Sequence, residues 1–151
     1  MIAVDTNILV YAHRKDAVPH TQAAAVISRL AEGKAAWAIP WPCVHEFMAI
    51  VTHTRIFNPP STLKEACKQV SAWLESPVLV MLGEDEGYWP VLERTLSQAK
   101  LSGPKVHDAR IAALCLHHGV KELWSADRDF KQFPALSTRN PLLNENDKHQ
   151  K

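Results

Sequence analysis

The chain has 151 residues, 46% of them hydrophobic and 22% charged, and its formal net charge is +1. This composition is typical of one globular domain, and it excludes a disordered chain or a protein that binds nucleic acid through a strong overall positive charge. The sequence has no run of about 18 uncharged apolar residues and no basic segment before its first apolar run. We therefore expect no membrane span, no secretory signal and a cytoplasmic location.

Apolar runs alternate with stretches of helical spacing along the chain. In chain order, the pattern predicts a strand at 1–4, helices at 6–13 and 21–32, a strand at 35–39, helices at 43–55 and 63–74, a strand at 77–82, helices at 88–100 and 106–118, a strand at 122–126 and a short strand at 136–138. This alternation predicts an α/β fold with a central, mostly parallel sheet of four to five short strands and helices on both faces. We expect one domain at 1–141 and a polar C-terminal tail at 142–151.

Local signals suggest how individual helices begin and which face they bury. Thr6 or Asn7 can cap the first helix, and Ser61 is expected to cap the helix at 63–74. The apolar residues of that helix form a stripe that we expect to face the core: Leu63, Ala66, Cys67, Val70 and Leu74. The three cysteines lie among apolar neighbours, without the spacing of a zinc site, so we expect reduced thiols packed in the core: Cys43, Cys67 and Cys115.

Carboxylates follow two of the predicted strands. Asp5 interrupts the first hydrophobic segment, MIAVDTNILVYAH, directly after its strand. Because ligands of open α/β sheets bind beyond the carboxyl ends of the strands, Asp5 is a candidate site residue, although it could instead only cap the next helix. Asp127 follows the strand at 122–126 in the same way. We favour Asp127 as a site residue over Asp129, which could cap a short turn.

Two further carboxylates are predicted to lie on helices. Glu46 borders the apolar face of its helix, where an unpaired glutamate is rare, and the alternative is a rim glutamate paired with Arg55 or a lysine. Asp108 stands at the N-terminal end of an inward-facing row, and the alternative is an aspartate that only satisfies free N–H groups of the helix start. The rest of that row is apolar: Ile111, Ala112 and Cys115.

These four carboxylates are expected to converge on one crevice. Closely packed carboxylates repel one another, and hard divalent cations such as Mg²⁺ or Mn²⁺ prefer oxygen ligands. Such a cation lowers the pKa of a bound water and neutralises charge on a phosphate under attack. The sequence therefore favours metal-dependent hydrolysis of a phosphate ester, which requires no nucleophilic side chain. It shows no glycine-rich phosphate loop that would favour ATP binding.

The acidic residues and their contexts resemble the PIN domain, and within it the VapC-type ribonuclease toxins. The resemblance covers nearly the whole chain and is carried by four segments in the order of that family: VDTNILVYA, VHEF, VHDARIAAL and SADRDF. Two further segments, VTHTRIFNPP and FPALSTRNPL, are similar to a mycobacterial-type branch.

The resemblance implies a PIN-like fold and a metal-dependent endoribonuclease that uses Mg²⁺, with Mn²⁺ as a substitute. It maps the acidic set onto Asp5, Glu46, Asp108 and Asp127, with Asp5 and Asp108 as the most direct metal ligands. Residues that support this set in the family correspond to Thr6, Asn7 and Ser125. It also implies a structured RNA substrate such as transfer or ribosomal RNA, a cognate antitoxin of a type II toxin–antitoxin pair, and a homodimer.

Basic and histidine side chains near these segments are further candidates. Four basic residues could position phosphate, although an exposed, solvated side chain is the alternative for each: Arg14, Lys105, Arg110 and Arg128. His45 and His107 each precede a candidate metal carboxylate, but adjacent helical residues point about 100° apart, so we expect both to face elsewhere. His117 and His118 are expected to serve a helix end and solvent.

Two other functions remain as alternatives. A Mg²⁺-dependent phosphatase of the haloacid dehalogenase type would use Asp5 as a nucleophile, but it requires a second aspartate at the position of Asn7. A non-catalytic RNA-binding or antitoxin-binding module with a PIN-like fold would not need four acidic residues, because clustered like charges without a metal only reduce stability.

Overall fold

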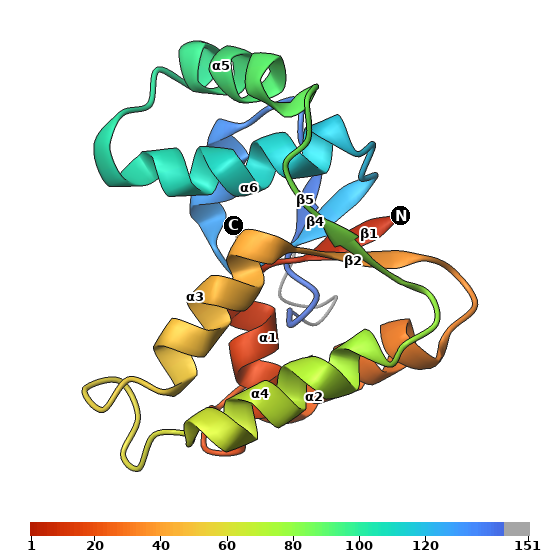
Figure 1. Cartoon of the computed structure of the whole chain (residues 1–151), viewed down its shortest axis with the longest axis vertical. Coiled ribbons are helices and arrows are strands. Elements are labelled where there is room, and N and C mark those ends of the chain that lie inside the picture. Colours follow the sequence, from red (N-terminus) through yellow and green to blue (C-terminus); the bar gives the residue numbers. More distant parts are fainter. Residues whose placement is uncertain (144–151) are drawn as a thin grey trace.

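A parallel sheet of five strands forms the centre of the computed structural model, which describes residues 1–143 (Figure 1). The strands are β1 (Ile2–Val4), β2 (Trp37–Pro40), β3 (Leu79–Leu82), β4 (Glu122–Trp124) and β5 (Thr138–Arg139). They lie in the order β3–β2–β1–β4–β5, and each neighbouring pair is parallel. The predicted α/β fold is confirmed.

Helices cover both faces of this sheet. They are α1 (Thr6–His13), α2 (His20–Glu32), α3 (Trp41–Val51), α4 (Leu63–Leu74), α5 (Tyr88–Ala99) and α6 (Val106–His117), with two 3₁₀-helices, η1 (Gly103–Lys105) and η2 (Arg128–Gln132). Figure 1 shows α1 to α4 on one side of the sheet and α5 and α6 on the other. The chain builds outward from β1 to β3 and then crosses back to β4. The strand order therefore reverses between β1 and β4, the place where open α/β sheets bind ligands.

Some helix ends differ from the predicted ones. The N-cap position of α1 is Asp5, where the sequence suggested Thr6 or Asn7. α3 begins at Trp41, two residues before the predicted start at 43, because Pro42 fits the first turn of a helix, where its missing N–H costs no hydrogen bond. The helix ends at Val51, whose carbonyl accepts a hydrogen bond from the Ser61 N–H at 2.8 Å.

The start of α4 is capped by Thr62, so the predicted cap, Ser61, was wrong. Thr62 Oγ1 accepts a hydrogen bond from the Glu65 N–H (3.1 Å), and the Glu65 carboxylate accepts one from the Thr62 N–H (3.0 Å). The Ser61 hydroxyl is buried and instead contacts His13 Nε2 at 2.9 Å and the Arg14 guanidinium at 3.1 Å. Ser61 therefore joins α1 to the chain that leads into α4.

The predicted apolar stripe of α4 was partly right, because Ala66 is buried and Val70 is half-buried against the core. Its other members were wrong: Leu63 is 68% exposed and Leu74 45% exposed, and Cys67 lies on the surface. Trp73, which the stripe left out, packs on the core. The other two cysteines are buried as predicted: Cys43 and Cys115.

No helix within residues 1–143 is long and apolar enough to cross a membrane. We retain the proposal that residues 1–141 form one domain followed by a polar tail at 142–151. Residues 144–151 of that tail lie outside the described residues.

Truncating Phe47 should destabilise the fold strongly. Its ring is fully buried and packs edge-on against Trp73 (centroids 4.8 Å apart) and His13 (5.3 Å). Phe47→Ala should lower the free energy of unfolding by about 3–5 kcal/mol, measured by urea denaturation. Leu63→Ala, on the exposed side of α4, should change it by at most about 0.5 kcal/mol. A larger loss for Leu63→Ala than for Phe47→Ala would contradict the described core.

Candidate active site at the carboxyl ends of β1 and β4

Two aspartates come after the neighbouring central strands. β1 and β4 pair in parallel with Val4 opposite Trp124, and the Asp5 N–H donates a hydrogen bond to the Trp124 carbonyl at 3.0 Å. Asp5 follows β1 directly, and Asp127 lies just beyond β4. Both carboxylates therefore lie at the point where the strand order reverses, as their positions in the sequence predicted.

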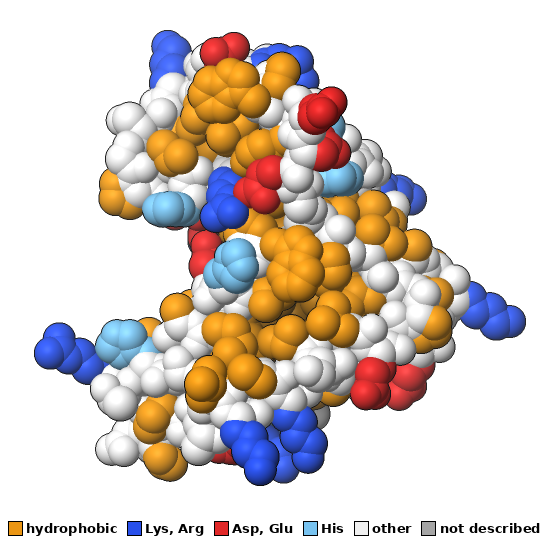
Figure 2. Space-filling view, viewed as in Figure 1, with side chains coloured by type: hydrophobic (Ala, Val, Ile, Leu, Met, Phe, Trp, Pro, Cys, Tyr) orange, Lys and Arg blue, Asp and Glu red, His pale blue; other side chains and the backbone are white. Residues whose placement is uncertain are grey.

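Two helices bring further carboxylates to the same place. Glu46 projects from α3 and Asp108 from the first turn of α6, and with Asp5 and Asp127 they line a cavity of about 350 Å³, here called the acidic cavity. Figure 2 shows the surface hollowed between α6 and α3, with acidic side chains in the hollow. Much of the remaining wall is apolar, including Tyr11, Ile50, Phe57, Ile111 and Phe130.

Asp5 is buried, with 4% of its surface exposed. Its Oδ2 accepts a hydrogen bond from Ser125 Oγ at 2.7 Å, and its Oδ1 accepts a weak one from Cys43 Sγ at 3.7 Å. Although Asp5 occupies the N-cap position of α1, its side chain makes no capping hydrogen bond. Helix capping therefore does not explain why a carboxylate is buried here.

Ser125 and Asn7 tie the ends of the two strands together. Besides donating to Asp5, Ser125 Oγ accepts a hydrogen bond from the Asp127 N–H at 2.9 Å. The Asn7 side-chain oxygen accepts one from the Ala126 N–H at 3.3 Å. The segment that carries Asp127 is thus held against the segment that carries Asp5.

Glu46 is held by a neighbour from α1. Thr6 Oγ1 donates to its carboxylate at 2.6 Å, and Glu46 forms no ion pair with Arg55 or a lysine within the described residues. The ion pair that the sequence allowed for a rim glutamate at this position is therefore absent from the described residues. His45 is exposed, stacks on Trp41 with centroids 6.5 Å apart and does not line the acidic cavity, as expected.

Asp129 belongs to the same acidic group. The Asp129 N–H donates to Asp127 Oδ1 at 2.8 Å, so Asp127 caps η2 and the expected capping role of Asp129 was wrong. Asp108, Asp127 and Asp129 each present an oxygen within 4.8 Å of the others. From the sequence we favoured Asp127 over Asp129 as a site residue, although Asp129 is only two residues away and therefore near the same strand end.

Burial and the charges of neighbouring carboxylates make ionisation of Asp5 and Asp108 less favourable. Burial raises the pKa of Asp5 from 3.8 to about 6, and the carboxylates of Glu46 and Asp127 add to the rise, although the Ser125 hydrogen bond opposes it. Burial also raises the pKa of Asp108, helped by Asp127 and Asp129. None of the described residues lining the acidic cavity is lysine or arginine. A donor set made only of carboxylate oxygens fits a hard divalent cation.

None of the four predicted basic residues lines the acidic cavity. Arg14 is bonded to Asp16 at 2.6 Å and Arg110 to Glu84 at 2.8 Å, and neither lines the acidic cavity. The other two are exposed, one in η1 and one in η2: Lys105 and Arg128. His107 is also exposed and does not line the cavity.

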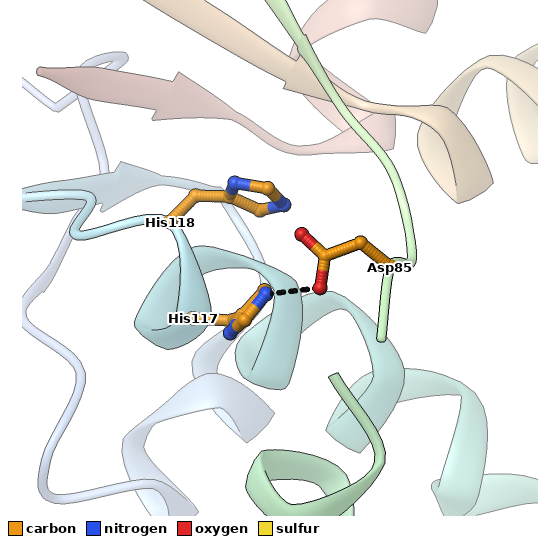
Figure 3. Close-up of side chains that lie close together, drawn as sticks. All are labelled: Asp85, His117 and His118. Atoms are coloured by element: carbon orange, nitrogen blue, oxygen red, sulfur yellow. Dashed lines mark hydrogen bonds and ion pairs between the residues drawn. The ribbon is translucent and has the colours of Figure 1, made fainter. Parts of the chain in front are cut away.

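A second cluster of titratable side chains lies at the end of α6 (Figure 3). His117 Nε2 lies 2.7 Å from Asp85 Oδ1, and this contact lowers the pKa of Asp85. His118 Nε2 lies 2.9 Å from the Gly83 carbonyl. Both histidines thus fasten the loop between β3 and α5 to α6, beyond the role at the helix end expected from the sequence. None of these residues lines the acidic cavity.

Comparison with known proteins identifies the family. The sequence model described as the PIN domain matches residues 2–136. The chain belongs to the PIN domain family. Ribonuclease VapC43 of Mycobacterium tuberculosis is 34% identical over 142 residues, which cover 94% of this chain and 96% of that protein. Ribonuclease VapC48 of the same species is 31% identical over 138 residues, covering 91% and 95%. The predicted resemblance to mycobacterial VapC proteins is confirmed.

Solved structures of this PIN domain family share the fold. VapBC2 from Rickettsia felis, bound to a DNA fragment from its promoter, superposes with a TM-score of 0.64 and 22% identity, covering 93% of this chain and 98% of that one. Mycobacterium tuberculosis VapC20, described as a sarcin–ricin loop cleaving toxin, superposes with a TM-score of 0.61 and 14% identity, covering 87% and 93%. The predicted PIN-like fold is confirmed.

In the metal-free PIN domain, the contribution of Asp5 to stability should fall as the pH rises from about 4 to about 6. Asp5 binds its proton more tightly in the folded state (pKa about 6) than in the unfolded state (3.8), so the folded state is favoured below both values. Above both values it is destabilised by about 3 kcal/mol, because each pKa unit is worth about 1.4 kcal/mol.

Asp5→Asn should remove this part of the pH dependence. Urea denaturation in EDTA at about pH 4 and about pH 7 measures the difference between wild type and variant, so the other titrating groups cancel. An identical change of stability with pH in both proteins would contradict the burial of an ionisable Asp5 carboxyl.

Proposed function

We propose that this chain is a metal-dependent endoribonuclease, the toxin of a type II toxin–antitoxin pair, and that it cuts structured RNA such as transfer or ribosomal RNA. The observation that carries the proposal is the convergence of Asp5, Glu46, Asp108 and Asp127 on one cavity whose described lining has no lysine or arginine. Relatives at 31–34% identity are named VapC ribonucleases, which supports the same activity.

We assign Mg²⁺, with Mn²⁺ as a substitute, to the acidic cavity. Asp5 and Asp108 would be its most direct ligands, and Glu46 and Asp127 would complete the set. A hard divalent cation bound there supplies a water of lowered pKa and neutralises charge on the phosphate under attack. In this proposal the attacking group is that water, and Thr6 Oγ1 is engaged by donating a hydrogen bond to Glu46.

The protein's own side chains prepare this site. Ser125 and Thr6 hold the carboxylates of Asp5 and Glu46 through hydrogen bonds of 2.7 and 2.6 Å, so both oxygens are oriented before any ligand binds. Such outer contacts fix the ligands of metal sites, and their loss costs about 10–100-fold in affinity or activity. Asp127 is oriented from its backbone by Ser125 and by its role as the cap of η2.

The proposal includes partners besides RNA. A cognate antitoxin is supported by the VapC names of the mycobacterial relatives and by the likeness to the VapBC2 structure. We also propose a homodimer, on the basis of the family resemblance, and a cytoplasmic location, on the basis of the sequence composition.

Cleavage of RNA tests the proposed activity. Total RNA is incubated with the purified chain, freed of any co-purifying partner, in Mg²⁺, Mn²⁺ or EDTA, and new 5′ ends are mapped by sequencing. We expect discrete cuts that require the metal. Asp5→Asn and Asp108→Asn should reduce the rate by at least about a hundredfold, because the cation supplies several kcal/mol of charge stabilisation.

Asp85→Asn is the matched control for this experiment. It removes an exposed carboxylate from the second cluster, beside His117, and should leave the cuts unchanged. Cleavage that survives in EDTA, or that depends on Asp85 but not on Asp5, would refute the proposed site. No cleavage of any RNA would favour the non-catalytic binding module instead.

A further inference from the structure

A second cavity opens on the other side of Asp127. It has a volume of about 320 Å³ and lies at the carboxyl ends of β4 and β5, the neighbouring strands at one edge of the sheet. Asp127 lines both cavities, so the two cavities adjoin at this residue. The cationic residues of its wall give the second cavity its name here, the basic cavity: Arg128, Lys131 and Arg139.

The three cations come from two elements that flank the cavity. Arg128 and Lys131 lie in η2, and Arg139 ends β5, opposite Trp124 in the β4–β5 pair. The Arg139 guanidinium lies over the Trp124 ring, 5.5 Å from its centroid. Trp124 is itself fixed, because its Nε1 donates to Glu122 at 2.7 Å. Arg139 is an exposed residue, and its contact with the Trp124 ring positions its guanidinium at the wall of the cavity.

The charges of the two cavities are opposite. None of the described residues lining the acidic cavity is lysine or arginine, whereas three cations line the basic cavity beside a single carboxylate, Asp127. Within residues 1–143, none of these three cations forms an ion pair. The net charge of the whole chain is only +1, so the cations are concentrated locally.

We propose that the basic cavity binds the RNA backbone next to the phosphate that is cut. This inference rests on the proposed function and adds a path for the strand across Asp127. Arg128 and Arg139 can bind phosphate oxygens with paired N–H groups, and Lys131 adds a point charge. These three are positioning residues: they hold a neighbouring phosphate, while the bond that breaks lies in the acidic cavity.

The salt dependence of RNA binding tests this path. Binding of a fluorescently labelled single-stranded RNA of mixed sequence is measured by anisotropy over a KCl series, in the non-cleaving Asp5→Asn background. Each of Arg128→Gln, Lys131→Gln and Arg139→Gln should reduce the slope of log K against log salt by about 0.7, the contribution of one phosphate contact with single strands. Arg139→Lys should restore most of the slope lost in Arg139→Gln.

The controls are charge-matched variants of exposed cations that do not line the basic cavity. Lys34→Gln lies just before β2, at the opposite end of the strands from Asp127, and Arg94→Gln lies in α5. Both should leave the slope unchanged, and urea denaturation should show that all variants fold as stably as their parent. In the cleaving background, the basic-cavity variants should raise KM more than they lower kcat.

The outcomes separate this inference from the proposed function. If the wild type cuts RNA but all three basic-cavity variants keep the same slope, the inference alone is overturned. The basic cavity would then fit an acidic protein partner instead. If the slopes fall but no RNA is cut, RNA binding in the basic cavity is supported and the proposed nuclease activity is overturned. Equal losses in Lys34→Gln and Lys131→Gln would show that only overall charge matters, which also overturns the inference.

Discussion

A buried carboxylate at the end of the first strand is the constraint on which the rest of the site depends. Asp5 is 4% exposed and close enough to Glu46 and Asp127 for their charges to raise its pKa, which burial alone already raises. At neutral pH its ionisation costs the folded state about 3 kcal/mol. This cost is a large part of the stability of an ordinary protein, which is about 5–15 kcal/mol, so we expect it to persist only where function requires it. A divalent cation offsets it, because opposite charge favours the ionised form.

The sheet topology explains how this arrangement is built. Strand order reverses between β1 and β4, so the residues after both strands meet, and α3 and α6 approach from opposite faces with Glu46 and Asp108. Ser125 then serves both sides, donating to Asp5 and accepting from the Asp127 backbone. Positive charge lies across Asp127, in the basic cavity. Under the proposed function, this arrangement would separate the carboxylates that bind a cation from the cations that bind a polyanion.

The sequence predicted most of the acidic site because each residue carried a simple signal. Asp5 and Asp127 follow apolar strands, and Glu46 and Asp108 occupy positions next to apolar helical faces. Contacts between distant segments carried no such signal. The ion pair between Arg110 and Glu84, which are 26 residues apart in sequence, depends on how the loop after β3 lies against α6, and no local pattern shows it.

The fold shows the same limit. The order of strands and helices follows from local periodicity, and it was confirmed. Which side of α4 is buried depends on where Trp73 meets the core, and apolar spacing alone favoured Leu63 and Leu74. The basic cavity was missed for a related reason: Arg139 and Arg128 are separated in sequence and meet only because β5 pairs with β4.

The most direct test of the account is to locate Mn²⁺ in crystals of the wild-type chain by its anomalous scattering. We expect a peak inside the acidic cavity, in contact with the carboxylates of Asp5 and Asp108, and its loss in crystals of Asp108→Asn. A peak only at the second cluster, formed by Asp85, His117 and His118, or no bound Mn²⁺ at all, would contradict the assignment of a cation to the carboxylates that follow β1 and β4.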